Sequence, residues 1–406
     1  MSILIVGASV AGIRTAQALR MQGSTDQITL LGEELHHPYD KPPLSKEMLA
    51  REQGAPGADP GPGPVALLTE DELAALDVDL QLGVRATRLD PAARVVETEH
   101  NGTFGYNQLV IATGVVPRAL PGPVPAGVHT IRTADDALAL RTALARTPDV
   151  VVVGAGFIGA EFASAARAYG CSVTVVEQQP IPMAHILGPE VGGRLAGLHR
   201  ANGVALRTGV TVSHFEGDQR VSAVVLGTGE VLPADLVVVG IGARPATDWL
   251  ASSGLPITDG IDCDQHLRVI GFPDVHAAGD VARWPHPHYG FALRVEHWTN
   301  ANEHGALVAA DLLGRPAPPS PVPYVWSDQY GHRIQMAGLA NLGRLSRLTG
   351  PAADHLVALY ADDAGTVVAA VVVDDPRTFM KLRKAITRRV QADEVEVPDA
   401  QLTAPL

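Results

Sequence analysis

Two stretches of the chain, residues 3–34 and 149–179, share one pattern of hydrophobic and polar positions. Each begins with a short apolar run, turns at glycines into a segment with a helical period, and ends in a second apolar run followed by an acidic residue. This order predicts strand, helix and strand, which is a βαβ unit. Because the pattern occurs twice, we expect two nucleotide sites in one chain.

The rest of the chain alternates strand patterns with breakers. Residues 84–114 and 204–243 are rich in strand patterns and end in buried strands, and 275–281 form a third apolar strand. The Pro/Gly tract 51–64 predicts a mobile surface loop. The proline-rich segment 314–323 marks a boundary, after which the pattern predicts a small sheet with helical flanks.

Composition and charge exclude several classes of function. The 406 residues carry a net charge of −13, which disfavours nucleic acid and anionic membranes as partners. The early apolar run, 3–13, is too short and too glycine-broken to cross a bilayer, so we expect no membrane insertion and a cytoplasmic protein. Cys171 and Cys263 are too far apart in sequence for a redox dithiol. The paired histidines at 36–37 and 285–288 lack further ligands at metal-binding spacing, so we expect no metal.

The second βαβ unit carries an unbroken G-x-G-x-x-G motif at Gly154, Gly156 and Gly159. The first glycine permits the tight turn, the second lets a pyrophosphate approach the backbone, and the third allows close helix–strand packing. Glu177 ends the next strand, where a carboxylate accepts hydrogen bonds from ribose hydroxyls and repels a 2′-phosphate. No Arg or Lys follows it, so we expect NAD(H) rather than NADP(H). The alternative is that Glu177 is only a solvated strand end.

The first unit has the same motif with one substitution, since Ser9 stands between Gly7 and Gly12. Serine is small, and its hydroxyl could bond a phosphate or cap the helix. Glu33 is expected to bind the ribose as Glu177 does in the second unit, and Glu34 is the alternative. Two strand-ending segments, 109–114 (LVIATG) and 277–280 (AAGD), favour a flavin dinucleotide at this site, because a carboxylate at Asp280 can bind ribityl hydroxyls.

Together with GASVAG, GAGFIG and AAGD, three longer motifs carry a family resemblance: YDKPPLSK (39–46), EHWTNANEHG (296–305) and WSDQYG (326–331). Over nearly its whole length the chain resembles the FAD-dependent NADH:ferredoxin reductases, the putidaredoxin reductase-like enzymes that serve cytochrome P450 and Rieske-type oxygenases. The resemblance implies a glutathione-reductase-like α/β fold, with two Rossmann-type domains and a smaller α+β C-terminal domain. It predicts an FAD domain at 1–118 and 244–318, an NAD domain at 119–243 and a C-terminal domain at 319–406.

The resemblance also implies site residues. Lys46 would place its ammonium near the flavin with Glu161 as its ion partner, and Glu296 would align the nicotinamide; an exposed lysine at a helix start is the alternative for Lys46. The expected FAD contacts are Gly7, Ser9, Ala11, Gly12, Glu33, Lys41, Pro43, Lys46, Ala86, Ala112, Thr113, Gly114, Arg118, Arg132, Gly279, Asp280, Val281 and Trp298. The expected NADH contacts are Gly154, Gly156, Phe157, Ile158, Gly159, Glu177, Gly240, Ile241 and Gly242.

Without a redox cysteine, electrons would leave singly to an external acceptor, which the resemblance implies is a small [2Fe–2S] ferredoxin. The basic segment 376–389 predicts a helix that would dock an acidic ferredoxin near Trp326. Its charged residues are Arg377, Lys381, Arg383, Lys384, Arg388 and Arg389. The alternatives are a solvated helix face and core packing for Trp326. For the whole protein they are a rubredoxin reductase, an NADH oxidase-like flavoprotein, or a non-catalytic redox sensor like apoptosis-inducing factor.

Overall fold

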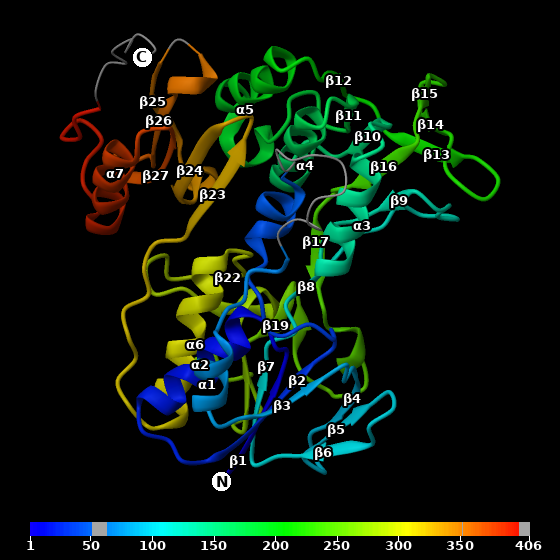
Figure 1. Ribbon diagram of the computed structural model, residues 1–406. Coiled ribbons are helices and arrows are strands. Elements are labelled where there is room, and N and C mark those ends of the chain that lie inside the picture. Colours follow the sequence, from blue (N-terminus) through cyan, green and yellow to red (C-terminus); the bar gives the residue numbers. More distant parts are fainter. Residues whose placement is uncertain (51–62, 351, 398–406) are drawn as a thin grey trace. The chain divides into compact units, whose positions relative to one another are not determined.

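The computed structural model describes residues 1–50, 63–350 and 352–397 (Figure 1). The predicted loop at 51–64 therefore lies outside the described residues except at its end. The chain divides into two compact units, each assembled from separated stretches. The first unit comprises Met1–Pro42, Pro64–Val116 and Ala243–Pro321, and the second comprises Pro43–Gly63, Pro117–Gly242 and Val322–Leu406.

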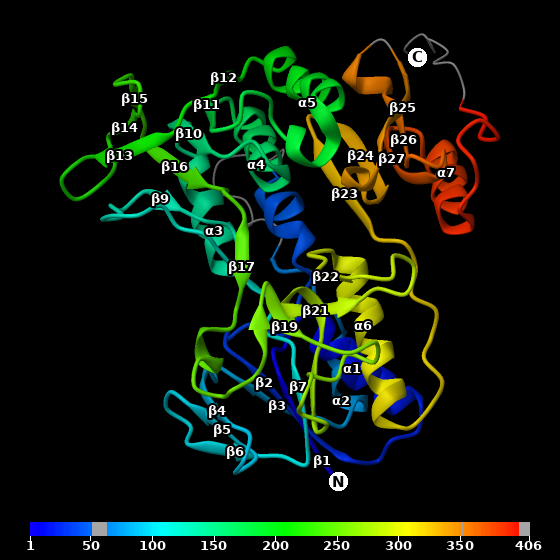
Figure 2. The same ribbon diagram turned by 180° about the vertical axis from the view of Figure 1, so that it is seen from behind.

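The first unit is built on a five-stranded sheet in the order β20-β7-β1-β2-β3, and every pairing in it is parallel. Its strands are β1 (Ser2–Val6), β2 (Gln27–Gly32), β3 (Asp79–Leu82), β7 (Gln108–Ile111) and β20 (Val275–Ala277). Helices α1 (Val10–Met21) and α6 (Trp298–Leu312) lie side by side, as Figure 2 also shows. The core consists of buried apolar residues of β1, β2, β7 and β20, packed against apolar residues of α1 and α6.

Smaller elements complete the first unit. One antiparallel sheet joins β4 (Ala86–Asp90), β5 (Val95–Thr98) and β6 (Thr103–Gly105). A second sheet joins β18 (Ile257–Thr258), β19 (Gly260–Asp262), β21 (Ala282–Pro285) and β22 (Ala292–Leu293). Helix α2 (Glu70–Ala75) begins with a capping box at its N-terminus, and the 3₁₀ turn η4 (Gly279–Val281) follows β20. The short strands β8 (Val115–Pro117) and β17 (Ala243–Pro245) pair with each other.

The second unit contains another five-stranded parallel sheet, in the order β12-β11-β10-β16-β9. Its strands are β9 (Val128–His129), β10 (Asp149–Val153), β11 (Ser172–Glu177), β12 (Ala205–Thr208) and β16 (Leu236–Val239). The accompanying helices are α3 (Ala134–Leu144), α4 (Phe157–Ala168) and α5 (Ala184–Ala201). A three-stranded sheet of β13 (Val212–Glu216), β14 (Ala223–Leu226) and β15 (Val231–Pro233) follows.

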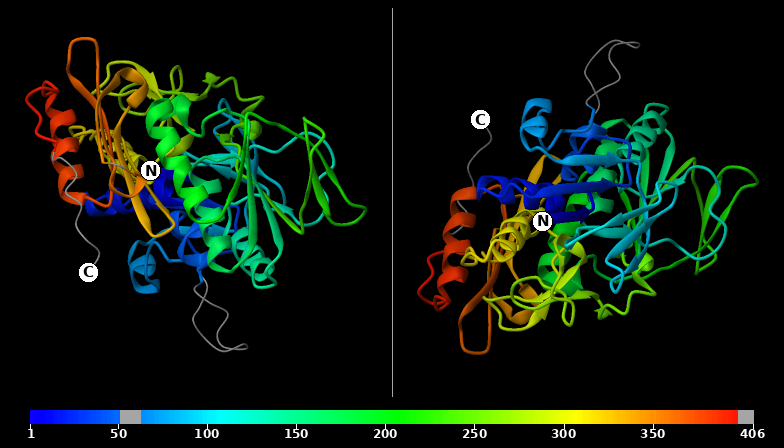
Figure 3. Two further views of the ribbon diagram at one scale, coloured as in Figure 1. Left: turned by 90° about the horizontal axis from the view of Figure 1, so that it is seen from above. Right: turned by 90° about the horizontal axis from the view of Figure 1, so that it is seen from below.

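The same unit holds an antiparallel sheet in the order β23-β24-β27-β26-β25. Its strands are β23 (Tyr324–Gln329), β24 (His332–Gly338), β25 (Arg344–Thr349), β26 (Val357–Ala361) and β27 (Val367–Val373). Helix α5 packs its apolar side on one face and α7 (Pro376–Arg388) packs on the other (Figure 3). Helix α7 begins where the Asp375 side chain accepts the Thr378 N–H and proline occupies the first position. No helix among the described residues is long and apolar enough to span a membrane.

Candidate nucleotide sites

The glycine turn of the first unit connects β1 to α1. The Gly7 N–H donates to Leu31 O at 2.8 Å, and Gly7 has a φ of +121°. A Cβ on Gly7 would lie 2.2 Å from Ala112 O, and one on Gly12 would lie 2.0 Å from Gly7 O. Side chains cannot fit at either position, so the backbone packing itself requires both glycines.

The second unit repeats this turn between β10 and α4. The Gly154 N–H donates to Val176 O at 2.8 Å, and its φ is +101°. A Cβ on Gly154 would lie 2.3 Å from Gly240 O, and one on Gly159 would lie 2.1 Å from Gly154 O. The two turns are therefore the same construction, each at the carboxyl ends of parallel strands where such folds bind dinucleotides.

The middle position of each motif, Ser9 or Gly156, is not forced to be glycine by close backbone contacts as the flanking positions are. A Cβ on Gly156 would meet nothing within 4 Å, so this residue faces open space. Ser9 has an extended backbone, with φ −120° and ψ −162°, which any residue adopts. Its side chain makes no cap hydrogen bond, which removes one of the two roles expected for the hydroxyl. The second turn thus leaves room for a phosphate at its helix N-terminus.

We predict that Ser9→Gly leaves flavin occupancy within about twofold of wild type, because Ser9 has an extended backbone and its side chain makes no cap hydrogen bond. The flavin-to-protein absorbance ratio of the purified protein measures this. Ser9→Ala, which removes the hydroxyl alone, is the matched control. Loss of flavin from both variants would show that the hydroxyl makes an essential contact.

Glu177 is held beside the second glycine turn. Its Oε2 accepts the Ala155 N–H at 2.8 Å and its Oε1 accepts the Gln179 N–H at 2.8 Å. Two backbone donors therefore fix the carboxylate, and each oxygen keeps a second lone pair for a hydroxyl. The predicted position of Glu177 at the site is consistent with this geometry.

Glu33 does not occupy the corresponding place in the first unit, which corrects the expected match. The bond from Gly7 to Leu31 parallels that from Gly154 to Val176, so Gly32 corresponds to Glu177. A Cβ on Gly32 would lie 2.9 Å from the Ala8 Cβ, so a side chain does not fit there without a shift. The acidic residue comes one position later, where Glu33 is exposed and lies 3.4 Å from Arg85 Nε.

The adjacent Glu34 is engaged locally. Its carboxylate accepts from Tyr39 Oη at 2.6 Å and from Lys41 Nζ at 2.5 Å. Lys41, expected to contact FAD, is therefore part of an ion pair in its own loop. Glu33 remains the better candidate for a ribose contact because its carboxylate is exposed and its ion pair with Arg85 is longer, at 3.4 Å.

Other predicted contacts of the first unit gather around its glycine turn. Ala112 and Thr113 follow β7, and Thr113 Oγ1 donates to Ala246 O at 3.0 Å. A Cβ on Gly279 would lie 3.0 Å from the Ala11 Cβ, so the AAGD turn packs on the first turn of α1. The structure thus brings together Ala11, Ala112, Thr113, Gly114, Gly279, Asp280 and Val281.

The remaining predicted residues are more dispersed. Trp298 Nε1 donates to Asp40 Oδ1 at 2.8 Å, which links the segment around Asp40 to the start of α6 within the first unit. Glu296 accepts from Arg294 Nη1 at 2.6 Å, so its predicted role with the nicotinamide would compete with an ion pair. Ala86 begins β4. Pro43, Lys46, Arg118 and Arg132 belong to the second unit, and their contacts with FAD stay predictions.

A buried ion pair joins Lys46 to Glu161, as expected from the sequence. Lys46 Nζ lies 2.8 Å from Glu161 Oε2, with the side chains 11% and 4% exposed. Ser45 Oγ also donates to Oε2, and Ser327 Oγ donates to Oε1 at 2.6 Å. Sequence reasoning missed both serines, although each lies inside a quoted motif. Both carboxylate oxygens are therefore satisfied by donors from the 43–50 segment and β23.

The basic residues of α7 form one exposed stripe. Arg377, Lys381, Lys384 and Arg388 are exposed and spaced by four, three and four residues, which places them on one helix face. The opposite face is buried against the sheet. Arg383 turns away from this stripe, with its guanidinium 5.1 Å from the Tyr324 ring centroid.

Trp326 packs on the Tyr324 ring that Arg383 contacts. Its ring stacks on Tyr324 with centroids 5.7 Å apart and an interplanar angle of 26°. It is half-buried rather than a core residue. Trp326 is therefore linked to α7 through Tyr324 and Arg383, on a different side of the helix from the basic stripe.

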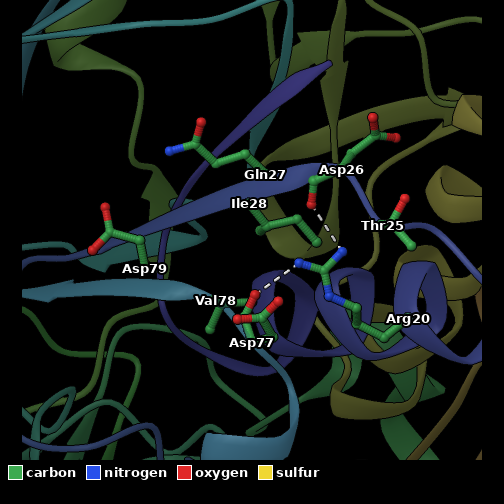
Figure 4. Close-up of a pocket in the computed structure, with 8 residues that line it drawn as sticks. All are labelled: Arg20, Thr25, Asp26, Gln27, Ile28, Asp77, Val78 and Asp79. Atoms are coloured by element: carbon green, nitrogen blue, oxygen red, sulfur yellow. Dashed lines mark hydrogen bonds between the residues drawn. The ribbon is translucent and has the colours of Figure 1, made fainter.

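Two other features do not form sites. Burial raises the pKa of both Cys171 and Cys263, so neither thiol is reactive at neutral pH. A surface hollow is lined by Arg20 and by Asp26, Asp77 and Asp79 (Figure 4). It lies at the amino ends of β2 and β3, whereas the glycine turn lies at the carboxyl ends of the strands. Arg20 donates there to four backbone carbonyls. The described residues contain no group of three His, Cys, Asp or Glu arranged for a metal.

Comparison with known proteins extends these observations. A family model described as pyridine nucleotide-disulphide oxidoreductase matches residues 1–305, and one described as reductase C-terminal matches 324–403. The chain is 35% identical over 402 residues to the biphenyl dioxygenase system ferredoxin–NAD(+) reductase component of Paraburkholderia xenovorans, covering 98% of this chain and 96% of the relative. It is 34% identical to rhodocoxin reductase of Rhodococcus erythropolis over 100% of this chain and 94% of the relative. The crystal structure of the covalent putidaredoxin reductase–putidaredoxin complex contains a chain with a TM-score of 0.88 and 32% identity, covering 96% and 93% of the two chains.

Proposed function

Because this chain belongs to the pyridine nucleotide-disulphide oxidoreductase family, we propose that it carries electrons from NADH, through bound FAD, to a [2Fe–2S] ferredoxin that feeds a P450 or Rieske-type oxygenase. The observation that carries this proposal is that a glycine turn of the same construction occurs in each unit. In addition, both cysteines of the chain are buried. Two dinucleotides can bind, while an internal dithiol cannot accept the electrons. The relatives are named as ferredoxin reductases of oxygenase systems, which supports an external iron–sulfur acceptor.

The first unit fits FAD. Gly7 and Gly12 let α1 start directly at the end of β1, so that the N-terminus of α1 would face the pyrophosphate. Asp280 would bind the ribityl hydroxyls and Glu33 the adenosine ribose. When bound, FAD supplies the chemistry of accepting a hydride and releasing its electrons one at a time.

The second unit would bind NADH. Gly156 leaves the pyrophosphate path open, and Phe157 and Ile158 begin the helix whose N-terminus faces it. Glu177, fixed by two backbone N–H groups, would bind the adenosine ribose diol. A fixed carboxylate disfavours a 2′-phosphate, which supports NADH rather than NADPH as the donor.

The positive charge of Lys46 would stabilise negative charge that develops at the bound cofactor. An ammonium held by a buried carboxylate is preorganised, so it can stabilise negative charge that develops nearby without reorganising. Glu161 positions this ammonium, and its two oxygens also accept hydrogen bonds from Ser45 and Ser327. No acid–base residue is required for the electron transfer.

The α7 stripe would dock the ferredoxin. Its four exposed cations stand out in a chain of net charge −13, so they give an acidic partner one attractive surface. Trp326 is linked to the same helix through Tyr324 and Arg383, so we propose that electrons leave near this end of the second unit. We propose a cytoplasmic location, where NADH and the oxygenase components are available.

Neutralising this stripe tests the docking surface. We expect Arg377→Gln with Lys381→Gln to slow ferredoxin reduction about tenfold at low ionic strength, because exposed charges chiefly raise association rates. NADH-dependent reduction of ferricyanide should remain unchanged. The matched control is Arg146→Gln with Arg200→Gln, two exposed cations outside α7. If both activities fall equally, or the control slows ferredoxin as much, the docking assignment is wrong.

A further inference from the structure

A buried histidine supports the AAGD turn of the first unit. The Gly279 N–H donates to His304 Nδ1 at 3.1 Å, and His304 is 1% exposed on α6. The donor is the first residue of η4, directly before Asp280. One imidazole therefore holds the backbone at the point where the turn presents its carboxylate.

The ring is held in a single protonation state. Since Nδ1 accepts, the proton is on Nε2. Burial, with a smaller contribution from His286, lowers the pKa of His304 to about 3, so the ring stays neutral at neutral pH. Nε2 has no hydrogen-bond partner among the described residues, and the ring meets Trp284 edge-on with centroids 5.1 Å apart at 87°. The Gly279 bond is thus the one specific polar contact recorded for this side chain in the described structure.

Close packing fixes the distance from His304 to the glycine turn. The adjacent Gly305 lies so near α1 that a Cβ there would be 2.7 Å from Arg14 and Thr15 atoms. Gly279 has a φ of +74° and packs on Ala11, one turn earlier on the same helix. Helices α1 and α6 therefore cannot slide past each other without moving His304 and the turn together.

We propose that His304 is a positioning residue for the dinucleotide site of the first unit, which fixes the Gly279–Val281 turn against the start of α1. The inference rests on the proposed function in that it takes FAD as the ligand of this site. If the Gly279 N–H lost its acceptor, a buried donor would be left unpaired. The turn would then shift, and Asp280 with it.

The test is the rate at which FAD leaves the purified holoprotein, followed by flavin fluorescence after dilution. We expect His304→Leu to release FAD about tenfold faster or more. His304→Asn, whose side-chain Oδ1 takes the place of Nδ1 and can accept the Gly279 N–H, should stay within about threefold of wild type. His304→Met, which keeps side-chain length without a strong acceptor, replaces the leucine variant if that protein does not fold.

His286→Leu is the matched control. His286 is 2% exposed and packs on the same Trp284, with ring centroids 5.3 Å apart, but no bond to the turn is recorded for it. It should lower the melting temperature without changing FAD release. Wild-type release from the leucine variant, or equal release from the leucine, asparagine and His286 variants, would overturn the inference. Absence of FAD from the wild-type protein would instead overturn the proposed function.

Discussion

Replacing Glu161 by alanine should destabilise the protein by about 3–5 kcal/mol, because the change removes the buried carboxylate that pairs with the Lys46 ammonium. Ser45 and Ser327 would lose their acceptor at the same time. Urea unfolding of the holoprotein at neutral pH measures the loss. This is the largest stability effect that we expect from a single substitution in the site.

The double variant Lys46→Met with Glu161→Leu is the control for that prediction. Removing both charges should restore most of the stability, since apolar residues of similar volume often replace a buried pair at little cost. The double variant should nevertheless be reduced by NADH more slowly than wild type, since the proposed role of Lys46 is electrostatic. Equal stability of Glu161→Ala and wild type would contradict the buried pair.

Glu177→Ala should lower kcat/KM for NADH by about 10- to 100-fold, because hydrogen bonds to a charged group contribute roughly 1.5–3 kcal/mol. Activity with NADPH should fall less or rise, since the repulsion of a 2′-phosphate is removed. The ratio of kcat/KM for the two donors is the measurement.

Glu33→Ala is the control, because it changes the acidic residue after the corresponding strand of the other unit. It should weaken FAD retention and leave the NADH-to-NADPH ratio unchanged. A ratio that stays constant in Glu177→Ala, or changes in Glu33→Ala, would reverse the assignment of the two nucleotides to the two units.

Features set by local geometry were predictable from the sequence. Gly7, Gly12, Gly154 and Gly159 are required by contacts within each βαβ unit, so their spacing alone locates both turns. The comparisons confirm the family and fold inferred from the motifs. Helix α7 could be predicted because the proline at its first position and the amphipathic spacing of its residues are local signals.

Features set by long-range packing were not predictable. Ser327 reaches Glu161 across 166 positions of sequence, and no periodicity reports such a contact. The one-residue offset of Glu33 depends on the space that Ala8 takes from Gly32, which is visible only in the folded sheet. His304 lies inside a motif that was noted for other residues, and its bond to Gly279 depends on how α6 crosses α1.

The proposal that this chain passes electrons from NADH to a ferredoxin is tested most directly by single-turnover re-oxidation. The holoprotein is first reduced anaerobically with one equivalent of NADH and then mixed with a [2Fe–2S] ferredoxin in a stopped-flow instrument. We predict that the flavin absorbance returns at a rate that rises with ferredoxin concentration, and that NADPH reduces the protein far more slowly than NADH. A reduced flavin that persists in the presence of ferredoxin would contradict the account and favour a non-catalytic redox sensor.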